Sequence, residues 1–192
     1  MSNSESSAER SVFSGKLGEV VQTVQPDGRV FERFRRPPGV RIVIVSGGNV
    51  LLTEEYRRET GDVDLRLPGG KVFDDKDSFV EAQRIGLLNE AVEEAVRREA
   101  LEEVGILVTQ SELLTVAQAG ATVEWDLYYF LVRDFAKAPG GPRPEKDEDI
   151  IPRWLEPEEI ITAIRNGQMS EWRSVGVLLG IVFPREFPHI GC

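Results

Sequence analysis

The amino-acid sequence predicts an α+β fold, a sandwich rich in β-sheet with a few packed helices. Three observations support this prediction. Strand-like runs separated by Gly and Pro turns fill residues 17–70, and a helical pattern without proline covers 78–104. Shorter strands and two further helical segments follow. Because the strands precede the long helix rather than alternate with helices, a doubly wound parallel sheet is not expected.

Size and composition suit one domain over residues 16–192, preceded by a disordered tail over 1–15. The only cysteine is Cys192, which favours a reducing, cytoplasmic compartment. No signal peptide or membrane-spanning stretch is expected. The net charge of −10 argues against a nucleic-acid partner, and an anionic substrate would need local cations or metal ions.

The strands are expected in pairs. Residues 16–37 predict an N-terminal hairpin, because the Asp27-Gly28 step favours a tight turn. Residues 39–46 and 49–57 flank two glycines and predict a second pair, and 63–70 predict a strand that Pro68 ends. Later strands are expected within 105–120, 125–135 and 149–155, and helices over 157–167 and 174–183.

The long helix carries acids on its apolar side. A capping box at Ser78 and Glu81 predicts the start of one long helix, or of two helices in series, and the core stripe is Val92, Ala95, Val96, Ala100 and Val104. Glu99 and Glu103 fall inside this stripe, and Glu102 lies beside it. Because an unpaired carboxylate loses several kcal/mol when it leaves water, these acids need a cation.

The spacing of the charges indicates which acids lack a partner. Glu90, Glu94, Arg98 and Glu102 can form a ladder of ion pairs along one side of the helix. Glu99 and Glu103, four residues apart, are then left to share one ion, and oxygen ligands favour Mg²⁺ or Mn²⁺. The alternative is an amphipathic helix with solvated salt bridges, and periodicity alone leaves both interpretations open.

Glu90, seven further residues and then Arg98-Glu99-Ala100-Leu101-Glu102-Glu103-Val104-Gly105-Ile106 resemble the Nudix box, G-x5-E-x7-R-E-U-x-E-E-x-G-U with U aliphatic. Ala100 is a mild departure from the pattern, at a position that is usually a larger aliphatic residue. The resemblance implies an α/β/α sandwich with a mixed β-sheet. The glycines at 69 and 70 precede Glu90 by more than the family's spacing, which predicts a helical insertion over 71–89. One interpretation of the insertion is a spacer that packs on the domain. The other is a functional element that forms a wall of the substrate pocket or a dimer contact.

Residues 50–59, 65–70, 128–135 and 145–160 extend the resemblance to the ADP-ribose or nucleotide-sugar pyrophosphatase branch. Two positions depart from that branch, which usually has an acid at Arg66 and often a proline near Thr122. The resemblance implies metal-dependent hydrolysis of the pyrophosphate bond of a nucleoside diphosphate linked to another moiety. The alternatives are a nucleoside triphosphate or dinucleoside polyphosphate hydrolase, or a nucleotide sensor without activity.

The resemblance also implies roles for individual residues. The expected ligands of Mg²⁺ or Mn²⁺ are Glu99, Glu103, Glu102 and the carbonyl of Gly69. The expected catalytic set is Glu102, Arg98, Glu90 and Glu148, with Glu148 as general base and Glu145 as second choice for that role. Substrate contacts are expected from Arg57, Arg35 and Tyr56. The N-terminal hairpin implies a homodimer.

Overall fold

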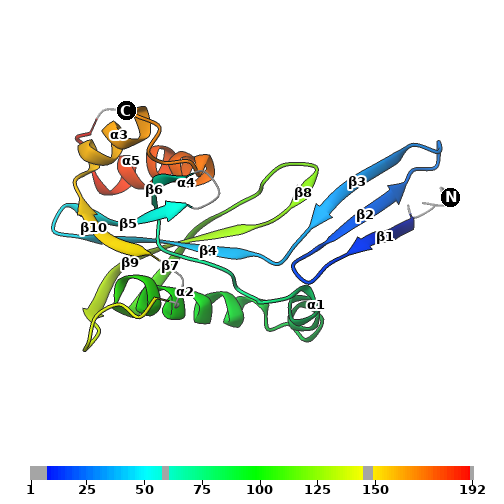
Figure 1. Ribbon diagram of the computed structural model, residues 1–192, viewed down its shortest axis with the longest axis horizontal. Helices are drawn as coiled ribbons and strands as arrows, with labels where there is room; N and C mark the ends of the chain where they lie inside the picture. The colour runs from blue at the N-terminus through cyan, green and yellow to red at the C-terminus, as the bar shows by residue number, and fades with distance from the viewer. Residues whose placement is uncertain (1–7, 58–60, 145–148, 191–192) are drawn as a thin grey trace.

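The computed structural model describes residues 8–57, 61–144 and 149–190 (Figure 1). An N-terminal sheet projects from one side of the molecule. Its strands, in the spatial order β1-β2-β3-β8, are β1 (Ala8–Ser14), β2 (Glu19–Val24), β3 (Val30–Arg35) and β8 (Val123–Glu124). β2 and β3 form the predicted hairpin, and Gly28 in its turn has φ of 84°.

Strand β1 corrects the prediction of a disordered tail over 1–15, because residues 8–14 pair with β2. Polar contacts hold this edge strand. Arg10 Nη2 donates to Gln22 Oε1 at 2.7 Å, and Arg33 of β3 pairs with Glu9. A strand that gains its stability from cross-strand polar pairs shows no apolar alternation in the sequence. Residues 1–7 lie outside the described part of the chain.

The main sheet has six strands and is mixed, as predicted. β4 runs parallel to β9, and the other neighbours are antiparallel. The order is β10-β5-β4-β9-β7, with β6 pairing to β5. Its strands are β4 (Gly39–Ser46), β5 (Asn49–Arg57), β6 (Asp62–Arg66), β7 (Ile106–Ala117), β9 (Leu127–Lys137) and β10 (Ile150–Leu155).

Helices cover both faces of this sheet (Figure 1). On one side lie α1 (Lys76–Ile85) and α2 (Leu88–Val104). On the other lie α3 (Pro157–Arg165), α4 (Trp172–Val177), the π-helical turn η1 (Leu178–Val182) and α5 (Phe183–Glu186). The predicted α/β/α sandwich is confirmed. No helix of the described residues has the length and apolar character needed to cross a membrane.

Two hydrophobic clusters fill the sandwich, one on each face. Ile42 and Ile44 of β4 pack with Val92 and Val96 of α2, whereas Val43 between them packs with the C-terminal helices. This alternation is the period of two that a strand imposes on its side chains. The central strand β4 is therefore anchored from both sides.

The predicted insertion is helix α1, which precedes the box helix α2. Its N-cap is Asp75, whose Oδ1 accepts from the Ser78 amide at 2.8 Å, so the helix begins before the expected cap at Ser78. Glu81 pairs with Arg84 instead of completing a capping box. Gly86, with φ of 77°, ends α1 in the left-handed conformation and separates it from α2.

Candidate active site

A cavity of about 640 Å³ opens between the C-terminal half of α2, the turn at 67–71 and strands β4 to β6. Charged side chains dominate its lining. Among the described residues its cations are Arg36, Arg41, Arg57, Arg66, Lys71 and Arg98, and its acids are Glu55, Asp74, Glu99, Glu102, Glu103 and Asp149. The cavity wall is therefore balanced in charge, although the whole chain carries −10.

Helix α2 directs two carboxylates inward. The predicted core stripe is buried, from Val92 to Val104. Glu103, on the same side, is 7% exposed, and the Glu99 side chain is 13% exposed. Glu102 is more open, at 40%. The predicted inward placement of Glu99 and Glu103 is confirmed.

The turn at Gly69-Gly70 runs between β4 and these carboxylates. Gly69 has φ of 142°, and a Cβ there would lie 2.2 Å from the Val40 carbonyl oxygen. A Cβ at Gly70 would lie 2.6 Å from both carboxylate oxygens of Glu99. The backbone of β4 therefore requires glycine at position 69, whereas a side chain at position 70 would displace the Glu99 carboxylate. The Gly69 amide donates to Glu103 Oε2 at 2.8 Å.

Burial raises the pKa of Glu103 to about 8. The hydrogen bond from Gly69 opposes this rise in pKa, the charges of Glu99 and Glu55 add to it, and Arg41 lowers the pKa again. Glu103 is thus a buried carboxylate whose charge its neighbours compensate only in part. Such a group takes up either a proton or a cation.

The donors of the cavity suit a hard divalent cation. Glu99, Glu102, Glu103 and Gly69, the four predicted ligands, all line it and offer oxygen atoms. Within the described residues, no three His, Cys, Asp or Glu side chains are gathered closely enough to hold an ion. Glu99 is instead drawn to Arg98, whose Nη2 lies 2.9 Å from Glu99 Oε1. The roles of these four residues stay predictions.

The predicted ladder along α2 forms only in part, because Arg98 pairs with Glu102 whereas Glu94 pairs with Arg97. Arg98 leans toward the turn at 67–71, donating to the Lys71 carbonyl at 2.5 Å, and it lies 3.9 Å from Glu102. Glu94 pairs with Arg97 at 3.8 Å. Glu90 is exposed, about two turns before Arg98. A carbonyl from outside the helix competes for Arg98, and helix periodicity alone does not reveal it.

The predicted substrate residues fall into two groups. Tyr56 and Arg57 line the cavity, and Arg57 Nη1 also donates to Glu55 Oε2 at 3.2 Å. Arg35 does not line it. Its Nε donates to Glu124 Oε2 at 2.5 Å within the N-terminal sheet, beside a second cavity of about 780 Å³. Successive residues of an extended chain point in opposite directions, and the neighbouring Arg36 takes the cavity position instead.

Arg36, Arg66 and Trp125 line the cavity and were not among the predicted site residues, and Arg173, which is not part of the lining, contacts Trp125. The guanidinium groups of Arg36 and Arg173 lie 4.3 and 4.2 Å from the ring centre of Trp125. Arg36 Nε and Trp125 Nε1 are buried and have no hydrogen-bond partner among the described residues. No motif or spacing marks these positions. The only signal was at Arg66, as a departure from the branch pattern.

Glu148 and Glu145, the candidates for general base, lie outside the described residues. Asp149, which follows Glu148, lines the cavity together with Ile150. The assignment of Glu148 stays a prediction.

Comparisons with known proteins agree with this geometry. The family model of the NUDIX domain matches residues 35–174. A search of curated proteins found no match. A crystal structure of an ADP compounds hydrolase aligns with a TM-score of 0.66 at 22% identity, covering 90% of this chain and 88% of that one. At this identity the likeness shows the fold.

The family match spans most of the chain and includes the box on α2. The chain therefore belongs to the Nudix family. The prediction of a Nudix pyrophosphohydrolase is confirmed at the level of enzyme class. Nudix hydrolases generally use divalent metal ions, which agrees with the oxygen donors of the cavity.

Proposed function

We propose that the protein hydrolyses the pyrophosphate bond of a nucleoside diphosphate linked to another moiety, with ADP-ribose or a nucleotide sugar as substrate and Mg²⁺ or Mn²⁺ as cofactor. One observation carries the proposal: Glu99 and Glu103 turn inward beside the Gly69-Gly70 turn, in a cavity where cations and acids balance. The fold likeness to an ADP compounds hydrolase supports an ADP-containing substrate.

Each residue of the site has a separate proposed role in the reaction. Glu99, Glu103, Glu102 and the Gly69 carbonyl would hold the metal, which when bound neutralises phosphate charge and lowers the pKa of water. Arg98 orients Glu99 through their contact at 2.9 Å. Glu148 would accept the proton of the attacking water.

Arg57 and Tyr56, at the cavity wall, would contact the phosphates and the linked moiety. Tyr56 is 54% exposed, which leaves its ring open to a ligand. The arginine would contact the oxygen atoms of the phosphates, which a guanidinium binds in a fixed geometry.

We also propose a homodimer, in the cytoplasm, that uses the N-terminal sheet. This sheet projects from the molecule (Figure 1) and carries Phe13, Val30 and Phe31 with 50% or more of their surface exposed. A small sheet gains stability when such apolar surface is covered. Light scattering during gel filtration tests the proposal, because a mass of 21.5 kDa for the eluted species would refute it.

A more anionic substrate is the second candidate, and Arg66 favours it. This arginine lines the cavity, and its buried Nε lies 3.1 Å from Asp64 Oδ2 in an ion pair without hydrogen-bond geometry. A fixed cation at this position would suit the longer phosphate chain of a nucleoside triphosphate or a dinucleoside polyphosphate.

The test is a panel of substrates with Mg²⁺ or Mn²⁺: ADP-ribose, nucleotide sugars, dinucleoside polyphosphates and nucleoside triphosphates, scored by released monophosphate or pyrophosphate. The proposal expects the highest kcat/KM for ADP-ribose or a nucleotide sugar. A preference for triphosphates would support the second candidate, and binding without hydrolysis would refute both.

A further inference from the structure

Charged side chains hold the backbone of Gly69 on both sides, one at its amide and one at its carbonyl. Its amide donates to Glu103 Oε2 at 2.8 Å, and its carbonyl accepts from Arg41 Nη1 at 2.7 Å. Glu103 belongs to α2 and Arg41 to β4, so one turn residue connects the helix to the sheet at the edge of the cavity. Arg41 Nη1 also lies 3.3 Å from the Val40 carbonyl.

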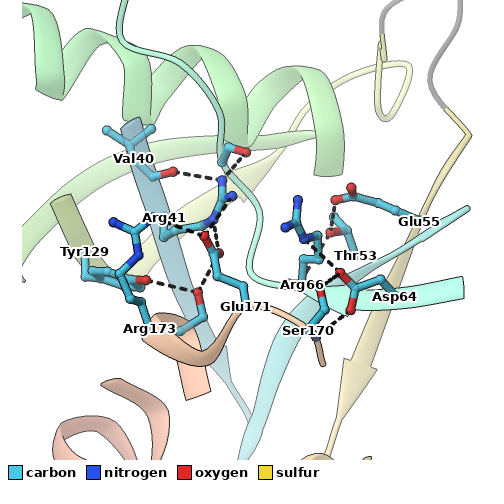
Figure 2. Close-up of polar contacts among 12 residues, drawn as sticks. Val40, Arg41, Thr53, Glu55, Asp64, Arg66, Tyr129, Ser170, Glu171 and Arg173 are labelled. Atoms are coloured by element: carbon cyan, nitrogen blue, oxygen red, sulfur yellow. Dashed lines mark hydrogen bonds and ion pairs between the residues drawn. The ribbon is translucent and has the colours of Figure 1, made fainter. Parts of the chain in front are cut away.

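The C-terminal segment fixes Arg41 in turn. Arg41 Nε donates to Glu171 Oε2 at 2.7 Å, and Ser174 Oγ donates to the same oxygen at 2.9 Å. Ser174 Oγ also lies 3.1 Å from the hydroxyl of Tyr129. Figure 2 shows Arg41 reaching Glu171 beside Tyr129, with Ser170 next along the chain facing Asp64. A continuous set of hydrogen bonds thus runs from α4 to Glu103.

Stability alone does not account for this ion pair. The side chains of Arg41 and Glu171 are 8% and 10% exposed, and Arg41 is the only charged residue of β4. Apolar side chains of similar volume commonly replace a buried ion pair without loss of stability. An apolar side chain at position 41 would lack the guanidinium group that donates to the Gly69 carbonyl.

We propose that Arg41, oriented by Glu171, is a positioning residue that fixes the Gly69 backbone through its carbonyl and thereby helps to place the Glu103 carboxylate that the Gly69 amide contacts. The inference rests on the proposed function, because it is the metal-dependent reaction that needs both oxygen atoms in place. A carbonyl oxygen has two lone pairs, so the bond from Arg41 leaves one for a cation. Ligand orientation by such neighbours typically changes metal affinity or activity by about 10-fold to 100-fold.

The test separates positioning from folding with a double variant. Arg41→Met or Glu171→Leu alone leaves a buried unpaired charge and should lower the Tm strongly. Arg41→Met/Glu171→Leu removes both charges and should recover most of the Tm. In this double variant we expect the Gly69 amide proton to exchange at least about tenfold faster by NMR, and Mn²⁺ to bind about tenfold more weakly. We also expect kcat to fall while KM stays near the wild-type value.

Arg133→Met/Glu186→Leu is the matched control, because this ion pair joins β9 to α5 with Nη2 and Oε1 2.6 Å apart and does not line the cavity. It should leave Gly69 exchange and Mn²⁺ affinity unchanged. If the main double variant recovers its Tm together with wild-type Gly69 exchange and Mn²⁺ affinity, the inference is overturned.

Arg41→Lys provides a second variant in case the double variant does not fold. Lysine keeps the positive charge beside Glu171 but lacks the planar fork that serves two acceptors. We expect the same acceleration of Gly69 exchange, and unchanged exchange would overturn the inference. A wild-type protein that binds Mn²⁺ but hydrolyses nothing would refute the proposed function alone, since the exchange experiment requires neither metal nor substrate.

Discussion

The two sides of helix α2 carry the same residue types in opposite settings. On the outer side, Glu93 and Glu94 are 53% and 74% exposed and pair with Arg97 at 3.3 and 3.8 Å. On the inner side, less than three turns away, Glu103 is 7% exposed and accepts a backbone amide. Residue type is therefore not what distinguishes a glutamate in a solvated salt bridge from a candidate metal ligand. Burial and the cations within reach distinguish them.

The contribution of the acids to stability differs between the two sides of α2. Exposed helix pairs contribute about 0.3–0.5 kcal/mol each, because water already solvates both charges. A carboxylate moved into the protein loses that solvation, and the rise in the pKa of Glu103 to about 8 reflects the loss. An inner acid is therefore retained at a cost to stability, which a bound cation would offset.

The largest effect is expected for Glu103→Gln. Glutamine keeps the shape of the side chain and an oxygen for the Gly69 amide but loses the charge, so the fold should persist while turnover falls about a thousandfold or more. Steady-state kinetics with ADP-ribose and Mg²⁺ provide the measurement. Activity near the wild-type level would show that the inner side of α2 does not hold the metal.

The pH dependence of stability distinguishes the same two sides. The pKa of Glu103 is raised from 4.5 to about 8, so the folded state keeps a proton that the unfolded chain loses. Without metal, this contribution to stability is present below about pH 4.5 and is lost as the pH rises to about 8, on the order of a few kcal/mol. Thermal denaturation from pH 5 to 8.5 should show the loss in wild type and not in Glu103→Gln. Parallel curves for the two proteins would contradict the prediction.

Glu148→Gln should have a smaller effect than the inner-side variant. A general base contributes about a hundredfold or more to the rate but does not hold the metal. We expect kcat to fall by about that factor while Mn²⁺ affinity, followed by calorimetry, stays close to that of wild type. The same experiment on Glu145→Gln decides between the two candidates: if only the latter variant is slow, Glu145 is the base.

The smallest effect is expected on the outer side. Glu93→Gln and Arg97→Gln should change the free energy of unfolding by no more than about 0.5 kcal/mol and leave turnover unchanged, because their ion pairs are exposed. Urea denaturation and the ADP-ribose assay check both statements. A tenfold loss of turnover in either variant would remove the contrast between the two sides.

Local patterns predicted much of the fold and the inward placement of two acids of the candidate site. Helix periodicity placed Val92, Val96, Glu99 and Glu103 correctly, because a helix repeats its geometry at every turn. The hairpin turn at Gly28 also followed from a short stretch of sequence, whereas the insertion before α2 was implied by the resemblance to the family pattern. These features depend on residues that are close in the chain.

Features that depend on distant residues were missed or wrong. The partner of Arg41 is Glu171, 130 residues away, and no spacing rule connects them. Arg98 keeps its ion pair with Glu102 but also donates to the carbonyl of Lys71, which helix periodicity does not predict. Strand β1 forms through polar contacts with β2 that an apolar pattern does not show. Tertiary partners decide these cases, and a single sequence does not name them.

Calorimetric titration of metal-free protein with Mg²⁺ or Mn²⁺ at pH 8.5 tests most directly whether the inner side of α2 holds a divalent cation. At this pH, above the raised pKa of Glu103, the carboxylate is available to a metal. We expect equal affinity for wild type and Glu93→Gln, and at least about tenfold weaker binding for Glu103→Gln. Equal affinity in all three proteins would contradict it.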